Sequence, residues 1–564
     1  MGRPSHIKPR PAGTSRRGFF TKTGTAAMAL AAAPVLSLAD NDQHDEDGKT
    51  RFEHGVASGD PLQRRVILWT RVTPAGKPVS VTVHYLVASD PELRHVVSRG
   101  RVRTGPESDY TVKVDAEGLR PATTYYYRFQ SHDARSPIGR TRTLPARATT
   151  RLRMAVVSCS NHAAGYFNAY RRIAERADLD AVLHLGDYLY EYGPNEFGST
   201  RTPEPPHEML TLSDYRRRHA QYKADADSQA MHRQHPLIAI WDDHEIANDS
   251  WQNGAQNHTD GVEGTWVDRV SVGLKAYYEW MPVRMPDPTQ PRRDQRAFEF
   301  GDLVDLTMLE ERLGARSQQL PATIPVPGLG NVFAQVGEFT NPARTLLGAE
   351  QEAWLAERLR ASAARWKFLG QGVMFAQLKG QGLPLAAGGG LFFNSDQWDG
   401  YQPARDRIYD IFKGEPSGHP PVDNCVILTG DIHSSWAADL SQDPNNPAIG
   451  TGGYNPVTGE GSRAVEFVGT SVTSPGLDDP TGATAAFLRS VNPHFKYIDL
   501  NRRGYMLLDV TRERVVCEWW FVDTVASISN VETFGVAFEV PHGGNRLQPA
   551  AMTTPRAHPP VLAP

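Results

Sequence analysis

The chain has 564 residues, a formal net charge of −4 and 22% charged residues, so no basic excess indicates sequence-specific nucleic-acid binding. Its length allows more than one domain and a large core. Its three cysteines, Cys159, Cys425 and Cys517, are too few for a disulfide framework.

The first 39 residues predict a signal peptide of the twin-arginine type. The pair Arg16 and Arg17 precedes a mild apolar run over about residues 24–38, and small residues follow for cleavage near Ala39. A disordered basic tail is the alternative interpretation. We therefore expect export by the twin-arginine machinery to the periplasm or the medium. The mature protein should have no transmembrane segment, because no other run is long enough to cross a bilayer.

Residues 51–148 predict an N-terminal all-β sandwich of the fibronectin or immunoglobulin type. Short strands are expected at residues 66–70, 79–85 and 110–114. Residues 119–127 resemble the tyrosine corner of fibronectin type III sandwiches, in which a tyrosine hydroxyl holds a loop backbone.

Residues 151–540 alternate strands with helices and predict a second, α/β domain. Strands are expected at residues 154–157, 181–185, 237–241, 303–309, 366–371 and 426–429, and helices at about residues 165–177, 349–362 and 398–412. We expect four layers, with two packed β-sheets flanked by helices. The polar loops 192–211 and 248–270 should form walls of a substrate cleft. Residues 541–564, rich in Pro, Gly and Ala, are expected to be a flexible tail.

Residue types that bind metals or transfer protons follow four of the predicted strands. They are Cys159, Asp187 with Tyr190, Asp243 with His244, and Asp431 with His433. Each has an ordinary explanation alone, such as a turn aspartate or a buried cysteine. Open α/β sheets place their sites at the carboxyl ends of strands, so the joint pattern predicts a site there.

The order of these motifs resembles the calcineurin-like metallophosphoesterases, but the chain departs from that pattern at most positions. Cys159 stands in place of the first Asp-x-His, Tyr190 in place of a second aspartate, and Asp431 in place of a histidine. These departures resemble the alkaline phosphatase D (PhoD-like) family, which has a β-sandwich in front of its catalytic domain. The resemblance extends from about residue 52 to residue 525.

The resemblance implies one Fe(III) ion and one or two Ca(II) ions. Cys159, Tyr190, His433 and Asp187 have donor atoms that suit a transition metal, and Asp243 and Asp431 have hard oxygens that suit calcium. Asp187 would bridge the metals, which would hold a hydroxide that attacks phosphorus. As in the superfamily, His244 would contact phosphate or protonate the leaving group. Asn161 and Asn248 would support ligands or bind phosphate.

The expected function is therefore that of an exported, metal-dependent phosphoesterase acting on phosphate monoesters, diesters or both. Its substrates could include nucleotides, phospholipids or teichoic-acid-like diesters. Two alternatives stay open: a phospholipase D-like phosphodiesterase on the same metal core, and an exported β-sandwich binding protein without catalysis. The core has no Gly-x-Ser-x-Gly turn before a helix, which argues against a serine hydrolase.

Overall fold

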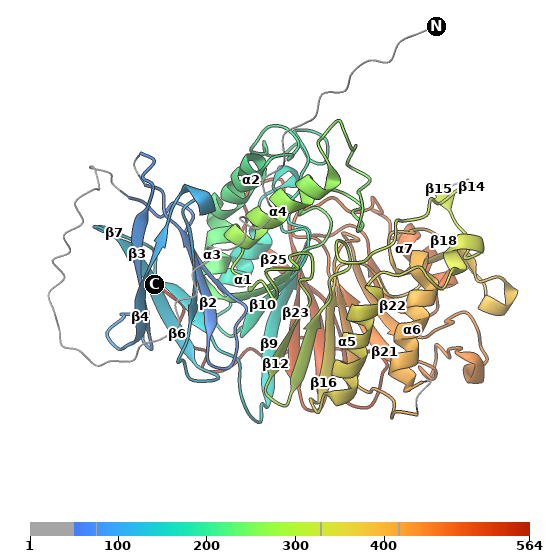
Figure 1. Cartoon of the computed structure of the whole chain (residues 1–564). Helices are drawn as coiled ribbons and strands as arrows, with labels where there is room; N and C mark the ends of the chain where they lie inside the picture. Colours follow the sequence, from blue (N-terminus) through green and yellow to red (C-terminus); the bar gives the residue numbers. More distant parts are fainter. Residues whose placement is uncertain (1–49, 75, 328–329, 416–417) are drawn as a thin grey trace, which may run out of the picture.

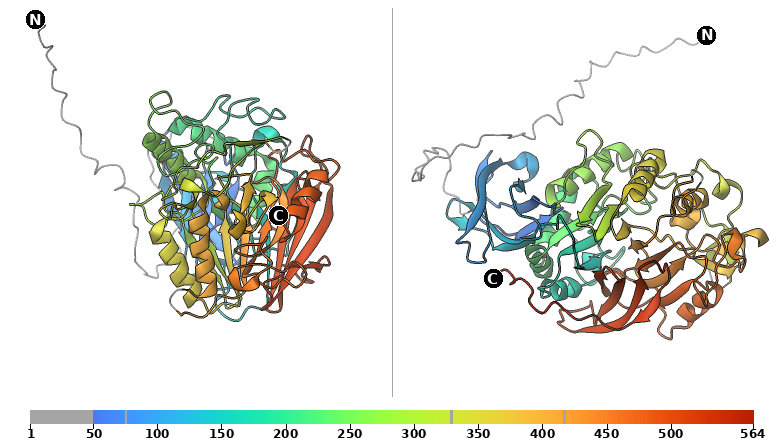
Figure 2. Two further views of the ribbon diagram at one scale, coloured as in Figure 1. Left: turned by 90° about the vertical axis from the view of Figure 1, so that its right-hand side faces the viewer. Right: turned by 90° about the horizontal axis from the view of Figure 1, so that it is seen from below.

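The computed structural model describes residues 50–74, 76–327, 330–415 and 418–564. The predicted signal peptide lies outside the described residues. A small β-rich part forms one end of the molecule, and a larger body of sheets and helices forms the rest (Figures 1 and 2). Within the described ranges, no helix combines the length and apolarity needed to cross a bilayer.

The larger sheet has the strand order β26-β25-β24-β23-β9-β10-β11-β1-β2-β5. Its central strands β9, β10, β11 and β1 are parallel. All positions of β10 and β11 are buried, as expected for parallel strands covered on both faces. In sheet order the strands span Gln548–Ala550, Glu532–Pro541, Arg514–Val522, Gly504–Thr511, Arg151–Val157, Ala181–Leu185, Pro236–Ile240, Val56–Gly59, Val66–Arg71 and Thr111–Ala116.

A second sheet of order β12-β13-β16-β19-β21-β20-β22 packs face to face with the first. Strands β13, β16, β19 and β21 are parallel. Val156 and Leu183 of the first sheet share one apolar core with Phe368 and Leu428 of the second. The strands span Arg296–Phe300, Val304–Met308, Trp366–Gln371, Cys425–Thr429, Ala464–Val468, Ser435–Leu440 and Phe495–Asp499.

Helices cover the outer faces of both sheets, which completes the four predicted layers. Helices α1 (Asn168–Ala174), α2 (Leu212–Ala224), α3 (Ala226–Gln234) and α4 (Trp266–Trp280) pack on the larger sheet. Helices α5 (Gly348–Ala361), α6 (Gln402–Lys413) and α7 (Ala483–Val491) pack on the smaller one. The α/β architecture is confirmed.

The N-terminal part is a β-sandwich, but one of its two sheets continues into the body. Strands β1, β2 and β5 belong to the larger sheet, and β1 pairs in parallel with β11. The other sheet has the order β4-β3-β6-β7 with β8 beside β6, and these strands span Val96–Thr104, Val81–Ala88, Thr124–Ser131, Ala134–Arg135 and Gly139–Arg142. The backbone N–H of Arg120 donates to the Tyr125 hydroxyl at 2.8 Å, as the tyrosine corner predicts.

Short elements decorate the loops of the body. The strand pairs are β14 (Ile324–Val326) with β15 (Gly330–Val332), and β17 (Lys379–Gly382) with β18 (Gly390–Phe392). The helix expected from residue 398 begins as the 3₁₀ turn η6 (Trp398–Tyr401) and becomes α-helical at Gln402, just before a proline. The other 3₁₀ turns are η2 (Pro106–Ser108), η3 (His162–Ala164), η4 (Gly337–Thr340), η5 (Leu385–Ala387) and η7 (Ile449–Thr451).

The C-terminal residues are not a free tail, contrary to the prediction. Strand β26 pairs with β25, and Arg556 donates to Asp180 at 2.9 Å. Further along, Gln234 donates to the Ala563 carbonyl at 3.0 Å and accepts from its N–H at 2.8 Å. The composition predicted flexibility because the segment lacks a core of its own. It is held instead by backbone and ion-pair contacts to distant residues, which composition does not reveal.

Candidate metal centre

The parallel strands of both sheets end at one shared edge, and the loops that leave them are tied together there. Gly430, after β19, donates its N–H to the Gly372 carbonyl, after β16, at 2.9 Å. Cys159, after β9, donates its N–H to the Gly186 carbonyl, after β10, at 3.2 Å. Val472, after β21 of the second sheet, donates its N–H to the Ser158 carbonyl, after β9 of the first sheet, at 3.0 Å, so the loops of the two sheets meet at this edge.

Four predicted ligands have backbones in the left-handed region, which non-glycine residues rarely adopt. The φ angles are 58° for Cys159, 54° for Asp187, 58° for Asp431 and 54° for His433. Each such residue costs on the order of 1–3 kcal/mol of local strain. Strain at all four positions indicates that the fold holds these side chains in orientations that relaxed loops would not give.

Glycines let the strand ends approach closely around Asp242. A Cβ on Gly186 would lie 2.4 Å from the Asp242 Cβ, and a Cβ on Gly372 would lie 2.5 Å from Asp242 Oδ1. Both distances are shorter than real Cβ contacts, so a side chain at either position would displace the aspartate. This close packing places the Asp242 carboxylate, after β11 of the first sheet, against the loop after β16 of the second sheet.

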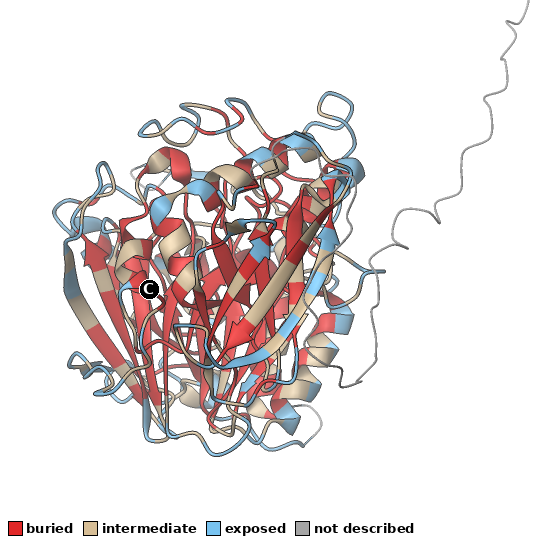
Figure 3. Cartoon of the chain, turned by 90° about the vertical axis from the view of Figure 1, so that its left-hand side faces the viewer, coloured by how far each residue is buried: buried red, intermediate tan, exposed pale blue. Residues whose placement is uncertain are grey.

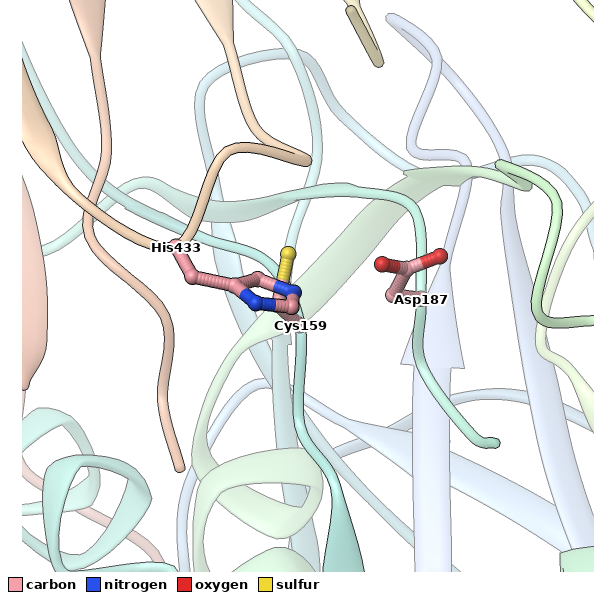
Figure 4. Close-up of side chains that lie close together, drawn as sticks. All are labelled: Cys159, Asp187 and His433. Atoms are coloured by element: carbon pink, nitrogen blue, oxygen red, sulfur yellow. The ribbon is translucent and has the colours of Figure 1, made fainter. Parts of the chain in front are cut away.

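Three groups of potential ligands lie side by side at this edge. Donor atoms fall within 4.8 Å of one another in the groups Cys159–Asp187–His433, Asp187–Asp243–His244 and Asp242–Asp243–Asp431. Figure 4 shows the first group, whose side chains reach one another from separate loops. The first two groups share Asp187 and the last two share Asp243, so the groups form one continuous cluster.

Tyr190 joins the first group through its hydroxyl. The hydroxyl oxygen lies 3.0 Å from Asp187 Oδ2 and 3.0 Å from His433 Nε2. The Nδ1 of His433 lies 2.9 Å from the Pro475 carbonyl oxygen and can only donate to it, so Nε2 carries the lone pair that faces the cluster. Thiol, phenol, imidazole and carboxylate thus converge on one point.

The carboxyl groups at this edge differ in the form that their surroundings favour. Burial opposes ionisation of Asp243, but Arg312 and His244 outweigh it and lower the pKa of Asp243. Burial raises the pKa of Asp187 well above its usual value, and Asp243 adds to the rise while His244 opposes it. Burial, with Asp242 next, does the same for Asp431. Burial, with Asp396 next, raises the pKa of Asp249 to about 7. Buried carboxylates that repel one another are stabilised by a bound cation.

His244 is held by a buried glutamate that the sequence analysis did not single out. Its Nδ1 lies 2.8 Å from Glu191 Oε2, and Glu191 Oε1 accepts from the Asn248 backbone N–H at 2.7 Å. Burial lowers the pKa of His244, but Asp243, Glu191 and Asp187 outweigh it and hold the pKa well above the usual value. These three carboxyl groups therefore favour the protonated form of the imidazole.

Arg312 is the second functional residue that the sequence analysis missed. It is fully buried after β13, donates to both oxygens of Asp242, and lies 2.7 Å from Asp396 Oδ2 and 3.2 Å from Asp431 Oδ1. Its position just after a strand was the available signal, since the other site residues share it. The guanidinium offsets part of the cluster's negative charge and orients Asp431.

The two predicted asparagines lie at the rim of the cluster. Asn161 donates to the Phe197 carbonyl and accepts from the Ala163 N–H at 2.9 Å, so its amide holds the loop that contains Phe197. Asn248 Nδ2 donates to Gln256 at 2.9 Å. A small cavity beside the cluster is lined by Asn161, Phe197 and Tyr190, among others, which places the loop expected as a cleft wall next to the ligands.

Arg503 lies near the backbone of His433, next to Gly476. A Cβ on Gly476 would lie 2.7 Å from the His433 carbonyl oxygen and 3.0 Å from Arg503 Nη1, so both groups border the same glycine. Its pKa is lowered by burial, while the charges of Asp499 and Cys159 oppose the change. In the part of the chain that the structure describes, no carboxylate forms an ion pair with Arg503. Arg503 is thus a cation near the ligands, on which Asp499 acts without a direct ion pair.

The side chains present fit two cations of different chemistry. Asp187 Oδ1 is buried and has no hydrogen-bond partner among the described residues, as expected for an oxygen reserved for a metal. Sulfur, phenol oxygen and imidazole nitrogen on one side suit a transition metal, and the all-carboxylate group on the other suits a hard divalent ion. The cluster therefore has donor types for two unlike cations, and the middle group connects the two sides through Asp187 and Asp243.

Comparisons with known proteins identify similar chains over most of the length. Residues 154–519 match the family model of PhoD-like phosphatase, and residues 37–145 match that of the PhoD-like phosphatase N-terminal domain. The chain is 37% identical over 474 residues to alkaline phosphatase D of Bacillus subtilis (strain 168), covering 82% of this chain and 76% of the relative. A solved structure of PhoD superposes with a TM-score of 0.78 at 34% identity, covering 90% of this chain and 93% of that one.

Proposed function

The chain belongs to the PhoD-like phosphatase family and is a phosphoric ester hydrolase, and we propose that the cluster around Asp187 is its active site. The observation that carries this proposal is the sharing of ligands. Asp187 and Asp243 each belong to two neighbouring groups of donor atoms, which is the arrangement that a two-metal site requires.

For the metals we propose Fe(III) at Cys159, Tyr190, His433 and Asp187, and Ca(II) at Asp243 and Asp431 with Asp187 shared. The donor types support this choice, because thiolate and phenolate suit a ferric ion and carboxylates suit calcium. When bound, such a metal pair polarises a phosphate ester and lowers the pKa of water. The metals would also keep the Cys159 thiol and the Tyr190 phenol ionised, against the burial that raises the pKa of both groups.

His244 is the residue we assign to the ester itself. Glu191 accepts the Nδ1 proton, so Nε2–H is the donor left for a phosphate oxygen or for the departing alkoxide. The ring packs against Tyr190 with centroids 4.1 Å apart and 31° between the ring planes, which restricts its orientation. A cationic imidazole fixed in this way stabilises the negative charge that develops in phosphoryl transfer.

Arg503 is the second group that we assign to the substrate phosphate. Its charge has no ion-pair partner among the described residues, and it lies near His433 at the ligand cluster. A guanidinium can donate two parallel hydrogen bonds to a phosphate. Arg503 would therefore hold the ester against the ligands while His244 acts from another side.

We also propose that the protein is exported by the twin-arginine route, on the strength of Arg16 and Arg17 and the apolar run that follows them. This route carries folded proteins, which suits a site whose metals must be inserted before secretion. Cleavage should occur near Ala39. N-terminal sequencing of protein collected outside the cytoplasm tests this proposal, and replacing both arginines with lysine should retain the precursor inside the cell.

Elemental analysis together with a substrate panel tests the active site. We expect iron and calcium in the purified protein and hydrolysis of p-nitrophenyl phosphate, bis-p-nitrophenyl phosphate or both, with no turnover by Asp187→Asn. The matched control is Asp133→Asn, at an exposed turn of the N-terminal sheet. A phosphatidylcholine arm distinguishes the phospholipase D-like alternative. Full activity of Asp187→Asn would place the site elsewhere. The filled set of ligand positions and the family membership favour an enzyme over a binding protein without catalysis.

A further inference from the structure

The carboxylate of Glu191 has one oxygen for His244 and a second oxygen that two donors hold. Glu191 is completely buried. Its Oε2 lies 2.8 Å from the Nδ1 of His244. Its Oε1 accepts from the backbone N–H of Asn248 at 2.7 Å and from the side-chain amide of Asn257 at 2.9 Å. The last torsion of a glutamate has broad minima, so the donors to Oε1 set the plane in which Oε2 meets the imidazole.

Of these two donors, only Asn257 depends on the identity of its side chain. Among the described residues, the bond to Glu191 is the one hydrogen bond that the Asn257 amide makes. Asn248 donates through its backbone N–H, which every residue except proline has. The residue type at position 257 therefore decides whether Oε1 has one donor or two.

The chain brings Asn257 to Glu191 by folding back onto Asn248. The backbone N–H groups of Gln256 and Asn257 donate to the Asn248 carbonyl at 3.0 and 3.3 Å, and the Asn248 amide donates to Gln256 at 2.9 Å. These contacts bring two donors that are apart in the sequence onto the same carboxylate oxygen. They hold the loop without using the amide of Asn257, which is left to bind Glu191.

The buried Arg269 of α4 fixes the backbone of Asn257. In the view of Figure 3 most loops are exposed or half-buried, whereas Arg269 is only 1% exposed. Its Nη1 donates to the Asn257 carbonyl at 2.9 Å. A buried guanidinium requires partners for its N–H groups, so this bond holds the loop to the helix and sets where residue 257 begins.

The same arginine connects this loop with the strand end that carries His244. Its Nη2 donates at 2.6 Å to Glu208, in the first of the two polar loops predicted as cleft walls. Its Nε donates to the Tyr215 hydroxyl at 3.2 Å, and that hydroxyl donates to the Ile246 carbonyl at 2.7 Å. Ile246 is two residues after His244. One buried side chain thus fixes Asn257 relative to the backbone next to His244.

We propose that Asn257 is a positioning residue of the reaction, which orients His244 through Glu191. The inference rests on the proposed function, in which His244 acts on the phosphate ester. Without the Asn257 amide, the Glu191 carboxylate has a single donor on Oε1 and can rotate, so the imidazole points at the ester for a smaller part of the time. A catalytic group displaced from its productive orientation lowers the rate even where the substrate still binds. The loop 248–270 then belongs to the catalytic apparatus.

Steady-state kinetics of the full chain with its metals test the proposal, with p-nitrophenyl phosphate as the substrate. Asn257→Ala removes the donor, and loss of a hydrogen bond to a charged group should lower kcat about tenfold or more. KM should stay within about twofold of wild type, because the groups proposed to bind the ester are unchanged. The control is Asn253→Ala, in an exposed turn of the same loop and outside the hydrogen bonds described above. Its kcat should stay within about twofold of wild type.

A double-mutant cycle shows whether Asn257 acts through Glu191. In the Glu191→Ala background there is no carboxylate to orient, so adding Asn257→Ala should lower kcat by no more than about twofold further. A residue that only stabilises the loop would lower kcat by the same factor in both backgrounds. Melting temperatures confirm that each variant is folded under the assay conditions. Asn257→Leu, which has a similar volume and no donor, repeats the test if the alanine variant does not fold.

Four results would overturn the proposal. They are a wild-type kcat in the Asn257 variant, a rise in its KM with unchanged kcat, an equal loss in Asn253→Ala, and an undiminished loss in the Glu191→Ala background. Asp187→Asn is assayed in parallel. Its loss of turnover supports the active site whatever Asn257 does, so failure of the positioning role is distinguishable from failure of the proposed function.

Discussion

Replacing Arg312 with methionine removes the buried cation that lies among Asp242, Asp396 and Asp431. Removing one partner of a buried ion pair costs about 3–5 kcal/mol, because the remaining charges are left uncompensated. Unfolding entropy is about 2.1 cal/mol/K per residue, so roughly 500 ordered residues give about 1 kcal/mol/K. The melting temperature in a chelator should therefore fall by about 3–5 °C.

Calcium should recover part of this loss, because a divalent ion can compensate the carboxylates that Arg312 leaves behind. The matched control is Arg405→Met, which breaks a buried pair with Asp399 in the α6 region, outside the ligand cluster. It should lose similar stability without recovery by calcium. Differential scanning fluorimetry with chelator and with calcium measures both effects. Melting of Arg312→Met within about 1 °C of wild type in chelator, or equal recovery of both variants, would refute the reasoning.

Four further predictions follow from the site and from the domain junction. Asp187→Asn should abolish hydrolysis, while its melting temperature in the presence of a chelator should stay close to that of wild type. Retained turnover would contradict the bridging role of Asp187. Ferric iron at Tyr190 and Cys159 should give a visible absorption band that Tyr190→Phe shifts or removes, so a colourless, iron-free and active protein would exclude iron. Arg503→Met should raise KM for a monoester about tenfold or more, because a charged hydrogen bond contributes about 1.5–3 kcal/mol; an unchanged KM would remove Arg503 from the substrate site. Burial raises the pKa of Asp294 to about 7, so this group's contribution to stability is complete below about pH 4 and is lost as the pH rises to 7. Asp294→Asn should remove that part of the pH dependence, and identical pH profiles of melting would falsify the assignment.

The strand ends were predictable because burial on both faces leaves a plain signal. The strand expected at residues 181–185 has those bounds, and the strand expected at 366–371 also matches. Apolar runs bounded by Gly-Asp define such strands locally. Once these strands are parallel, the ends must meet, and the convergence of Cys159, Asp187 and His433 follows.

The helices α2, α3 and α4 were not predicted, although two of them had a local signal. Thr211 and Asp214 form a capping box at the start of α2, and Thr265 caps α4. Few apolar residues follow in α2, so the periodicity was weak there. The buried faces of these helices contain polar residues such as Arg218 and Lys223, whose partners come from other parts of the chain.

The ion pairs of the site could not be predicted either, because their partners also come from distant parts of the chain. Arg312 is a single arginine after a strand, and its partners Asp242, Asp396 and Asp431 are 70, 84 and 119 residues away in the sequence. No local pattern relates positions so far apart. Glu191 supports His244 from across the site. Spacing identifies the donors that follow strands, but only the folded chain shows which charges compensate them.

The parallel pairing of β1 with β11 ties the beginning of the described chain to a strand that is synthesised much later. Ser58 cannot pair with Pro236 across the two strands until the intervening sandwich and helices have left the ribosome. Such distant contacts raise the contact order and slow folding. Until the pairing forms, one edge of β11 offers unpaired backbone groups to other chains. A shortened chain that lacks the first strand should therefore aggregate rather than form a smaller enzyme. By pairing with β11, the first strand of the sandwich covers an edge of the catalytic sheet that could otherwise pair with other chains.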